Sequence, residues 1–343
     1  MKRLLLPAGR FGIFSILLTS FQLLSSCGNS QETKPITDSL GKVDSMAIIN
    51  DQIRKDPANL DLYMRRSRLS MKQKDYAASL ADMDRVIAID SSKASYLLAA
   101  ADINFFVGRV VRTEQLLKRA VELNPENVDC LLRLAQLYHY LTKYEDELKY
   151  INMALRVDIH NSQAYFMKGM MYKDLHDTAK AISSMQTAVE QDPDHYNAYV
   201  QLGLLCAAQH NPLAESYYIN AIKINPNSEE AIYNLGIFYQ ENENWNRAIE
   251  TYTTLLKVNP HHFDAHFNLG MIHAVKLNMV DDGMKYFNLA IEDNPKEPRG
   301  FYGRGFCFEK KGDITNARTN YQMALKVDPN YTNAAIALGK LDK

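Results

Sequence analysis

Residues 229–262 read EEAIYNLGIFYQENENWNRAIETYTTLLKVNPHH, and this stretch decides the fold. Its apolar residues recur three or four positions apart in two blocks, Ile232–Tyr239 and Ala248–Leu255, as on the buried faces of two amphipathic helices. Pro260 follows the second block, and a helix ends before proline because proline lacks the amide hydrogen and restricts the residue before it. The stretch therefore predicts a helical hairpin.

The same pattern recurs through the chain with a period close to 34 residues. Proline after an acidic or amide residue marks most periods, and Ser91 and Ile159 fill the two positions without proline, giving the series 57, 91, 125, 159, 193, 226, 260, 295 and 329. A second series of small residues shows the same irregular steps: Ala164, Ala198, Ala231, Ala265, Gly300 and Ala334. One extra residue falls between Lys276 and Asp282. Such a fixed period predicts an array of stacked hairpins.

These positions resemble the tetratricopeptide repeat, a helical hairpin with small and aromatic residues at fixed places and a closing proline. The best matches are Tyr199, Leu202, Gly203, Ala214, Tyr218, Ala221 and Pro226, and then Phe301, Gly305, Phe308, Ala317, Tyr321, Ala324 and Pro329. The resemblance implies an all-α, right-handed superhelical solenoid of about eight hairpins over residues 60–331. The repeats are predicted at 60–93, 94–127, 128–161, 162–195, 196–228, 229–262, 263–297 and 298–331.

Both ends of the array are predicted to carry single helices. Residues 44–59 look like an unpaired second helix, and residues 332–343 look like a first helix that caps the array. The first repeat departs from the family pattern, because Arg66, Ser67 and Ser70 stand where Leu, Gly and Tyr are usual.

The N-terminus has the three regions of a secretory signal. Lys2, Arg3 and Arg10 precede the apolar run Phe11–Leu24, and small residues lead from it to Cys27. The run has 14 residues, whereas a transmembrane helix needs about 20. The end of the run resembles the lipobox of bacterial lipoproteins. The alternative is an ordinary signal peptide in which the cysteine is incidental.

The lipobox resemblance implies that residues 1–26 are removed as a lipoprotein signal peptide and that Cys27 becomes acylated. Residues 27–43 then form a lipidated, flexible tether, since they are polar and lack an apolar period. Gly28 stands where Gram-negative lipoproteins retained at the inner membrane carry Asp, so we expect an outer-membrane lipoprotein. The leaflet is left open.

Charge and composition exclude several classes of protein. The 343 residues include 39 Lys and Arg against 40 Asp and Glu, for a net charge of -1. Such a balance argues against a nucleic-acid-binding protein, which needs a basic surface. The chain is 46% hydrophobic, so it is not a disordered polar chain either.

Candidate catalytic and metal-binding groups have structural explanations. Cys130, Cys206 and Cys307 fall on first helices of separate repeats and are predicted to be core thiols, although Cys206 and His210 could in principle form a nucleophile and base. Histidines 261, 262, 266 and 273 include a metal-ligand spacing, but the repeat pattern places two of them inside the hairpin. No nucleophile-elbow, Walker or zinc-protease motif occurs. We predict no enzyme activity, no cofactor and no metal.

The predicted binding residues lie on the side of each first helix that lines a concave groove in this family. Two positions on this side lie four residues apart, and the first is apolar or aromatic in all eight repeats. The second is polar in repeats 1–3, through Arg68, Asp102 and Gln136, and apolar from repeat 4 onward. Asn234 and Asn268 resemble the asparagine ladder of peptide-binding relatives, with simple solvation as the alternative. The predicted protein-binding residues are Phe166, Met170, Tyr233, Asn234, Ile237, Phe267, Asn268, Met271, Tyr302 and Phe306. The alternative is that part of this apolar stripe packs between neighbouring repeats.

The sequence thus predicts a lipid-anchored scaffold that binds partner proteins through its groove in the bacterial cell envelope. The expected partner is an apolar segment or helix of an envelope or secretion component, and the membrane contact is the lipid on Cys27. Two alternatives stay open. One is a periplasmic accessory protein that binds or processes glycan or cell-wall fragments, and the other is end-to-end stacking through the helix at 332–341.

Overall fold

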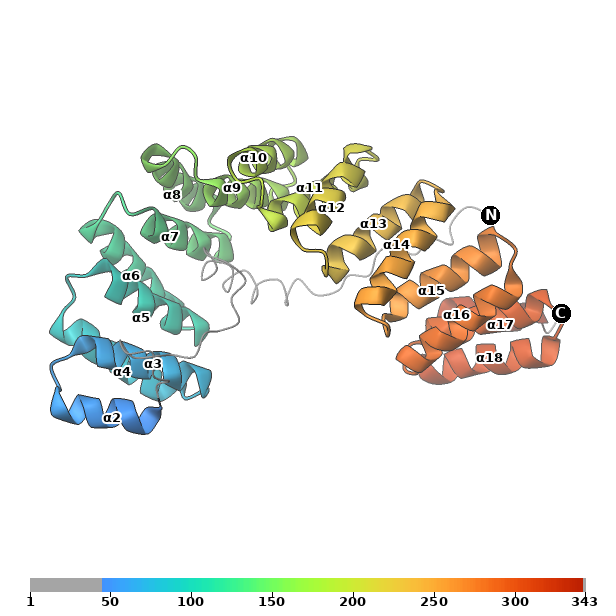
Figure 1. Cartoon of the computed structure of the whole chain (residues 1–343), viewed down its shortest axis with the longest axis horizontal. Coiled ribbons are helices and arrows are strands. Elements are labelled where there is room, and N and C mark those ends of the chain that lie inside the picture. The colour runs from blue at the N-terminus through green and yellow to red at the C-terminus, as the bar shows by residue number, and fades with distance from the viewer. Residues whose placement is uncertain (1–44, 342–343) are drawn as a thin grey trace. The chain divides into compact units, whose positions relative to one another are not determined.

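The computed structural model describes residues 45–341, and the regular structure in this range is entirely helical (Figure 1). The predicted signal peptide, Cys27 and the tether lie outside the described residues. Among residues 45–341, no helix combines the length and the apolar character that a bilayer crossing requires.

The helices alternate as first and second members of hairpins, as the 34-residue period predicts. The first helices are α3 (Leu60–Lys72), α5 (Ala94–Phe106), α7 (Val128–Tyr140), α9 (Ser162–Asp174), α11 (Tyr196–Ala208), α13 (Glu229–Glu241), α15 (Phe263–Met271) and α17 (Pro298–Lys310). The second helices are α4 (Tyr76–Ile89), α6 (Val110–Leu123), α8 (Tyr144–Val157), α10 (Thr178–Gln191), α12 (Leu213–Ile224), α14 (Trp245–Val258), α16 (Val280–Asp293) and α18 (Ile314–Val327). Single helices precede and follow them: α2 (Met46–Lys55) and α19 (Thr332–Leu341).

The chain divides into two compact units, which we call unit 1, ending at Asp177, and unit 2, beginning at Thr178. In unit 1, α2 packs on α3, and the hairpins α3–α4, α5–α6 and α7–α8 stack in chain order up to α9. In unit 2, each helix from α10 to α19 likewise packs on the next one along the chain. The predicted all-α array of helical hairpins is confirmed within each unit.

Every turn inside a hairpin contains one residue with left-handed backbone geometry. The residues are Lys74, Gly108, Thr142, His176, His210, Glu243, Asn278 and Gly312, with φ between 54° and 78°. Only two of them are glycine, the residue that adopts this geometry without steric cost. The turn conformation therefore repeats even where the sequence lacks the usual signal for it.

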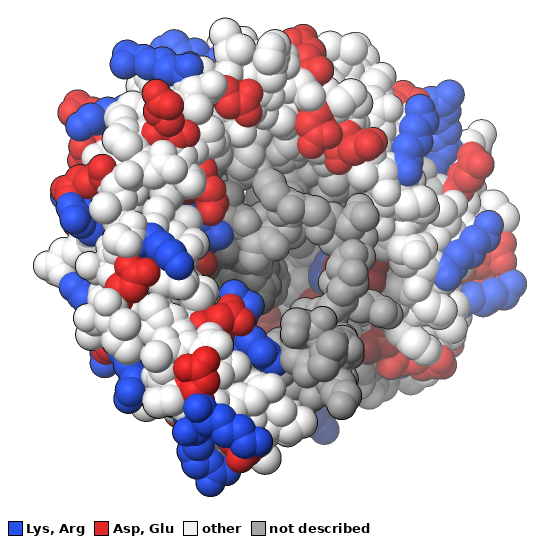
Figure 2. All heavy atoms as spheres, turned by 60° about the vertical axis from the view of Figure 1, so that its left-hand side comes forward, with Lys and Arg blue, Asp and Glu red and all other residues white. Residues whose placement is uncertain are grey.

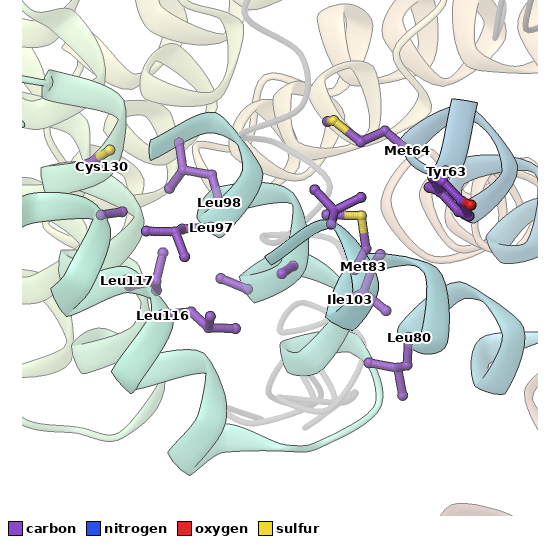
Figure 3. Packing of buried hydrophobic residues seen from close by; sticks show 14 of the residues in the cluster. Tyr63, Met64, Leu80, Met83, Leu97, Leu98, Ile103, Leu116, Leu117 and Cys130 are labelled. Atoms are coloured by element: carbon purple, nitrogen blue, oxygen red, sulfur yellow. The ribbon is translucent and has the colours of Figure 1, made fainter. Parts of the chain in front are cut away.

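Buried apolar residues from α2 to α7 form a core cluster that continues across successive hairpins, and a second cluster joins α7, α8 and α9. Figure 3 shows part of the first cluster, in which Tyr63 of α3, Met83 of α4 and Leu97 of α5 come from neighbouring helices. Each of these three side chains is at most 2% exposed. Since each hairpin buries its apolar face only against its neighbours, stacking is what stabilises the array.

Two of the three unusual residues of the first repeat, Arg66 and Ser67, make polar contacts in place of apolar packing. The guanidinium of Arg66 donates to both carboxylate oxygens of Asp82, at 2.9 and 2.6 Å, and to Oδ1 of Asn50 on α2, at 2.8 Å. The hydroxyls of Ser67 and Ser79 lie 2.8 Å apart where the helices cross. This network fastens α2 to the first hairpin.

The extra residue of the seventh repeat is taken up earlier than the sequence suggests. A π-helical turn spans Ile272–Lys276, directly after α15. A π-turn holds one more residue than an α-turn, so it absorbs an insertion without breaking the helix. The prediction that the insertion lies after Lys276, in the connection between the two helices, was wrong.

Candidate protein-interaction face

The predicted binding residues fall into one set in each unit. Phe166 and Met170 lie on α9 of unit 1, and both are half-buried. The other eight lie on α13, α15 and α17 of unit 2. We call the side of these three helices that carries Tyr233, Ile237, Phe267, Met271, Tyr302 and Phe306 the first-helix face.

Aromatic rings on the first-helix face pack against other rings, two of them just before the following first helix and one within its own helix. Tyr233 lies 5.5 Å from the ring of His262, which precedes α15. Phe267 stacks on Phe263 at 6.1 Å with an interplanar angle of 6°. Tyr302 meets Tyr331, which precedes α19, edge-on at 5.7 Å. Each of three consecutive repeats thus has an aromatic residue of the first-helix face in contact with another ring.

The apolar side chains of the first-helix face pack against neighbouring helices and are also partly exposed. All six are half-buried, and each also contacts one of the hydrophobic clusters between neighbouring helices. The stripe is therefore partly inter-repeat packing and partly accessible surface. Neither of the two interpretations of the sequence accounts for it alone.

Arg299 joins two repeats on this face, and the sequence patterns did not single it out. Its guanidinium lies 4.8 Å from the ring centroid of Phe263 and 5.2 Å from that of Phe267. It also forms ion pairs at 2.8 Å with Asp264 and with Glu297. Burial works against its charge, but the two carboxylates outweigh burial and raise the pKa of Arg299. A planar cation held between rings and carboxylates is a fixed feature that a ligand would meet.

The two asparagines proposed as a ladder have different surroundings. Asn234 is half-buried, whereas Asn268 is only 8% exposed. The amide nitrogen of Asn268 donates to the hydroxyl of Tyr252 at 3.2 Å, and that hydroxyl donates to Oε1 of Gln240 at 3.2 Å. The side chain of Asn268 thus belongs to a hydrogen-bond network inside the hairpin stack.

The first three repeats carry polar groups at a position of the first helix that is apolar in the later repeats. Asp102 on α5 accepts a hydrogen bond from Nη1 of Arg133 at 2.5 Å, and Arg133 also pairs with Asp129 at 3.0 Å. Burial raises the pKa of Asp102 to about 6, and the attraction of Arg133 opposes this rise. The equivalent positions further along the chain are apolar, beginning with Met170.

The displayed surface has no large field of one sign. Figure 2 shows Lys and Arg side chains interspersed with Asp and Glu, with uncharged areas between them. This distribution agrees with the nearly balanced charge of the chain and gives no extended electrostatic steering.

The histidine cluster is held together by a buried carboxylate. Asp293, with its side chain 3% exposed, accepts from Nδ1 of His266 at 2.6 Å and contacts Nδ1 of His261 at 3.1 Å. His262 instead caps α15, because its Nδ1 accepts from the amide of Ala265. In the described part of the chain, no group of three or more His, Cys, Asp or Glu residues is arranged to hold a metal ion.

The three cysteines of the repeats are free and buried, as predicted for core thiols. Burial raises the pKa of Cys206, which is 1% exposed, so its thiol is not activated as a nucleophile. His210 occupies the left-handed position of the following turn. A surface pocket of about 250 Å³ at α12–α14 contains none of the predicted binding residues; it is lined by Ile222, Ile232, Leu235, Tyr239, Arg247, Glu250, Thr251 and Thr254.

Comparisons with known proteins agree with this geometry. Residues 162–195, 233–298 and 300–331 match models of the tetratricopeptide repeat. The chain is 19% identical to human tetratricopeptide repeat protein 16 over 87% of its own length and 38% of that protein. It is 24% identical to human protein O-mannosyl-transferase TMTC3 over 66% of its length and 27% of that protein. The chain thus spans well under half the length of these curated relatives.

A solved structure shows the same fold. It is the C-terminal part of a TPR repeat-containing protein from Cytophaga hutchinsonii, with a TM-score of 0.60 and 19% identity over 69% of this chain and 98% of that one. The chain is therefore a tetratricopeptide repeat protein. In general kind, it is a helical-repeat scaffold for protein interactions.

Proposed function

We infer that this protein is a lipid-anchored scaffold of the bacterial cell envelope that binds an apolar segment of a partner protein along the first-helix face. One observation carries the proposal. Three consecutive repeats each leave a half-buried aromatic residue on the same side, at Tyr233, Phe267 and Tyr302. An aliphatic or aromatic residue follows each of them one helical turn later.

The geometry of this face favours a peptide or helix as ligand. Rings fixed by neighbouring rings lose little conformational entropy when a ligand covers them, so their burial contributes directly to affinity. Arg299 and its carboxylate partners supply polar groups beside the rings. A row of anchors at the spacing of the repeats suits an extended segment that crosses several repeats.

The proposed anchor explains why modest affinity would suffice. Two acyl chains on Cys27 would hold the protein stably at the membrane, and we propose the outer membrane because Gly28 follows the cysteine. Tethering raises the local concentration of the scaffold near any envelope component. The role is binding and tethering, without a catalytic step.

The binding proposal is tested by capturing partners from the native host. The variant Ile237→Glu, Met271→Glu, Phe306→Glu places charges on the first-helix face and should reduce capture of the specific partner by at least tenfold. The control places three charges at exposed apolar positions on second helices of the same unit, as Leu213→Glu, Ile314→Glu, Met323→Glu. Helicity measured by circular dichroism must be unchanged in both. If both variants capture the partner equally well, the assignment of the first-helix face as the binding site is wrong.

The anchor is tested separately by intact mass and membrane fractionation. The native protein should carry a diacylated Cys27 and stay with the outer membrane through a high-salt wash, and Cys27→Ala should be neither acylated nor retained in the membrane fraction after that wash. A soluble, unmodified native chain would refute the anchor and leave the binding proposal to its own test.

A further inference from the structure

The turns of the first three hairpins in unit 1 carry an exposed apolar and basic patch, which we call the turn patch. It consists of Lys74, Tyr76, Phe106, Arg109, Val111, Arg112, Tyr140 and Lys143. It lies on the edge of the hairpin stack formed by the turns, and it contains none of the predicted binding residues.

Aromatic contacts between the turns make the patch continuous. The ring of Tyr76, at the start of α4, lies 5.1 Å from that of Phe106, at the end of α5. Phe105 in turn lies 5.0 Å from Tyr140, at the end of α7. Each turn therefore touches the next one through aromatic rings.

Apolar groups in the patch are unusually accessible. Val111 is 72% exposed, Phe106 47% and Tyr140 45%. Single exposed apolar residues are common on protein surfaces. Three of them on adjacent turns form a cluster, and no other element of unit 1 covers the exposed part of these side chains. These side chains project from turns, so they form a convex row and not a cleft that could hold a peptide.

Basic side chains surround these apolar tips. Lys74, Arg109, Arg112 and Lys143 are all exposed. Nη1 of Arg112 donates to Oε1 of Gln115 at 3.4 Å, and Lys118 together with Lys143 lowers the pKa of Glu114. Residues 72–76, 106–112 and 140–146 hold five basic and three acidic residues, whereas the whole chain is slightly acidic. One of those acids, Asp75, is engaged as the cap of α4, where it accepts from the amide of Ala78.

We propose that the turn patch rests on a phospholipid surface containing anionic lipids. Aromatic and aliphatic tips insert at the level of the headgroups, while Lys and Arg beside them contact lipid phosphates. The charge of the patch is complementary to anionic lipid and selects this occupant over an apolar protein surface.

Apolar turns in unit 2 provide a matched control. Leu213 and Met279 are 48% and 45% exposed at two of these turns. Glu215 lies beside Leu213, and Asp281 and Asp282 follow Met279, so these turns lack the basic surplus. Comparable apolar exposure without positive charge should not bind the same vesicles.

The test is co-sedimentation of residues 28–343 with vesicles of phosphatidylethanolamine and phosphatidylglycerol at about 3:1. This chain contains every described helix and lacks the proposed acylation site, so failure of the anchor does not affect the result. We expect binding that weakens at high salt and is at least fivefold lower on phosphatidylcholine vesicles. Phe106→Asp with Val111→Asp, and separately Arg109→Glu with Arg112→Glu, should lower the bound fraction at least fivefold.

The variant Leu213→Asp with Met279→Asp should bind like the unmodified chain, and circular dichroism should show equal helicity in all variants. Three outcomes would overturn the proposal: no vesicle binding, equal binding by patch and control variants, or binding indifferent to anionic lipid. If the patch variants instead lose only a co-purifying protein, the surface is a protein interface and the lipid assignment is wrong.

Discussion

Tyr252 of α14 lies so close to Gly236 of α13 that a Cβ atom at Gly236 would be 2.5 Å from Cε1 of the ring. The ring is fully buried, and its hydroxyl is bonded on both sides. The same arrangement joins Gly305 to Tyr321, where the distance would be 2.8 Å. A glycine on the first helix and an aromatic ring on the second thus set the spacing of the hairpin.

Gly236→Ala should therefore destabilise unit 2 by about 1–3 kcal/mol, because a buried ring has little room to move. The control is Gly339→Ala on α19, where nothing lies within 4 Å of an added Cβ. Alanine there should be neutral or stabilising by up to about 1 kcal/mol, since glycine is the weaker helix former. Thermal unfolding followed by circular dichroism measures both, and equal shifts in the two variants would contradict the packing argument.

The pair Arg66–Asp82 should behave as a buried ion pair. The Asp82 side chain is 6% exposed, so Arg66→Leu alone leaves an uncompensated buried charge and should cost about 3 kcal/mol. The double variant Arg66→Leu, Asp82→Tyr copies the residues at the equivalent positions of the third repeat, Leu134 and Tyr150, and should recover most of the loss. Urea denaturation of the single and double variants measures the coupling free energy between the two residues. If the losses in the free energy of unfolding are additive, the pair does not act as a unit.

Stability should fall with rising pH because of His139 and Glu147. Nδ1 of His139 lies 3.1 Å from Oε2 of Glu147, and Nε2 lies 3.4 Å from Asp174. Burial opposes the charge on His139, but the two carboxylates outweigh it and raise its pKa above 6.5. Burial likewise raises the pKa of Glu147 above 4.5, although the histidine opposes that rise.

Both shifts mean that the folded chain holds protons more tightly than the unfolded chain, so they act in the same direction. The stability from His139 is complete below pH 6.5 and is lost as the pH rises through its higher folded pKa. Above pH 4.5, the raised pKa of Glu147 begins to lower the free energy of unfolding. The Tm should therefore fall between about pH 5 and pH 8, and Glu147→Ala with His139→Gln should flatten the profile. His176→Gln, at an exposed turn, is the control and should leave the slope unchanged.

The three repeat cysteines should resist thiol reagents in the folded protein. Burial raises the pKa of Cys130 to about 11 and that of Cys307 to about 12, and both side chains are fully buried. A thiol of this kind has almost no thiolate at pH 8 and reacts only when its helix opens. In a Cys27→Ala chain we expect slow labelling in buffer and three rapid equivalents in denaturant. Rapid native labelling of any one cysteine would show that its repeat opens readily.

The order and type of the helices followed from the sequence because they depend on local patterns. Spacing of apolar residues within about 14 positions, small residues at helix contacts and proline after most second helices act inside one hairpin. The repeat carries this information many times over, so even the first repeat kept its register with Arg66 and Ser67 in unusual places. The candidate face was predicted for the same reason, as one side of a helix whose orientation the repeat defines.

Only the tertiary structure decided which contacts the side chains at those positions make. Asn268 bonds Tyr252 from the preceding repeat, Arg299 sits on Phe263 and Phe267 from the repeat before its own, and His139 lies between acids of two other helices. These partners are 8 to 36 residues apart, and no local pattern links them. The sequence by itself determined the helices, their register and the side on which apolar residues gather. Only stacking determined how much of each side chain is left accessible, because burial depends on the neighbouring repeat.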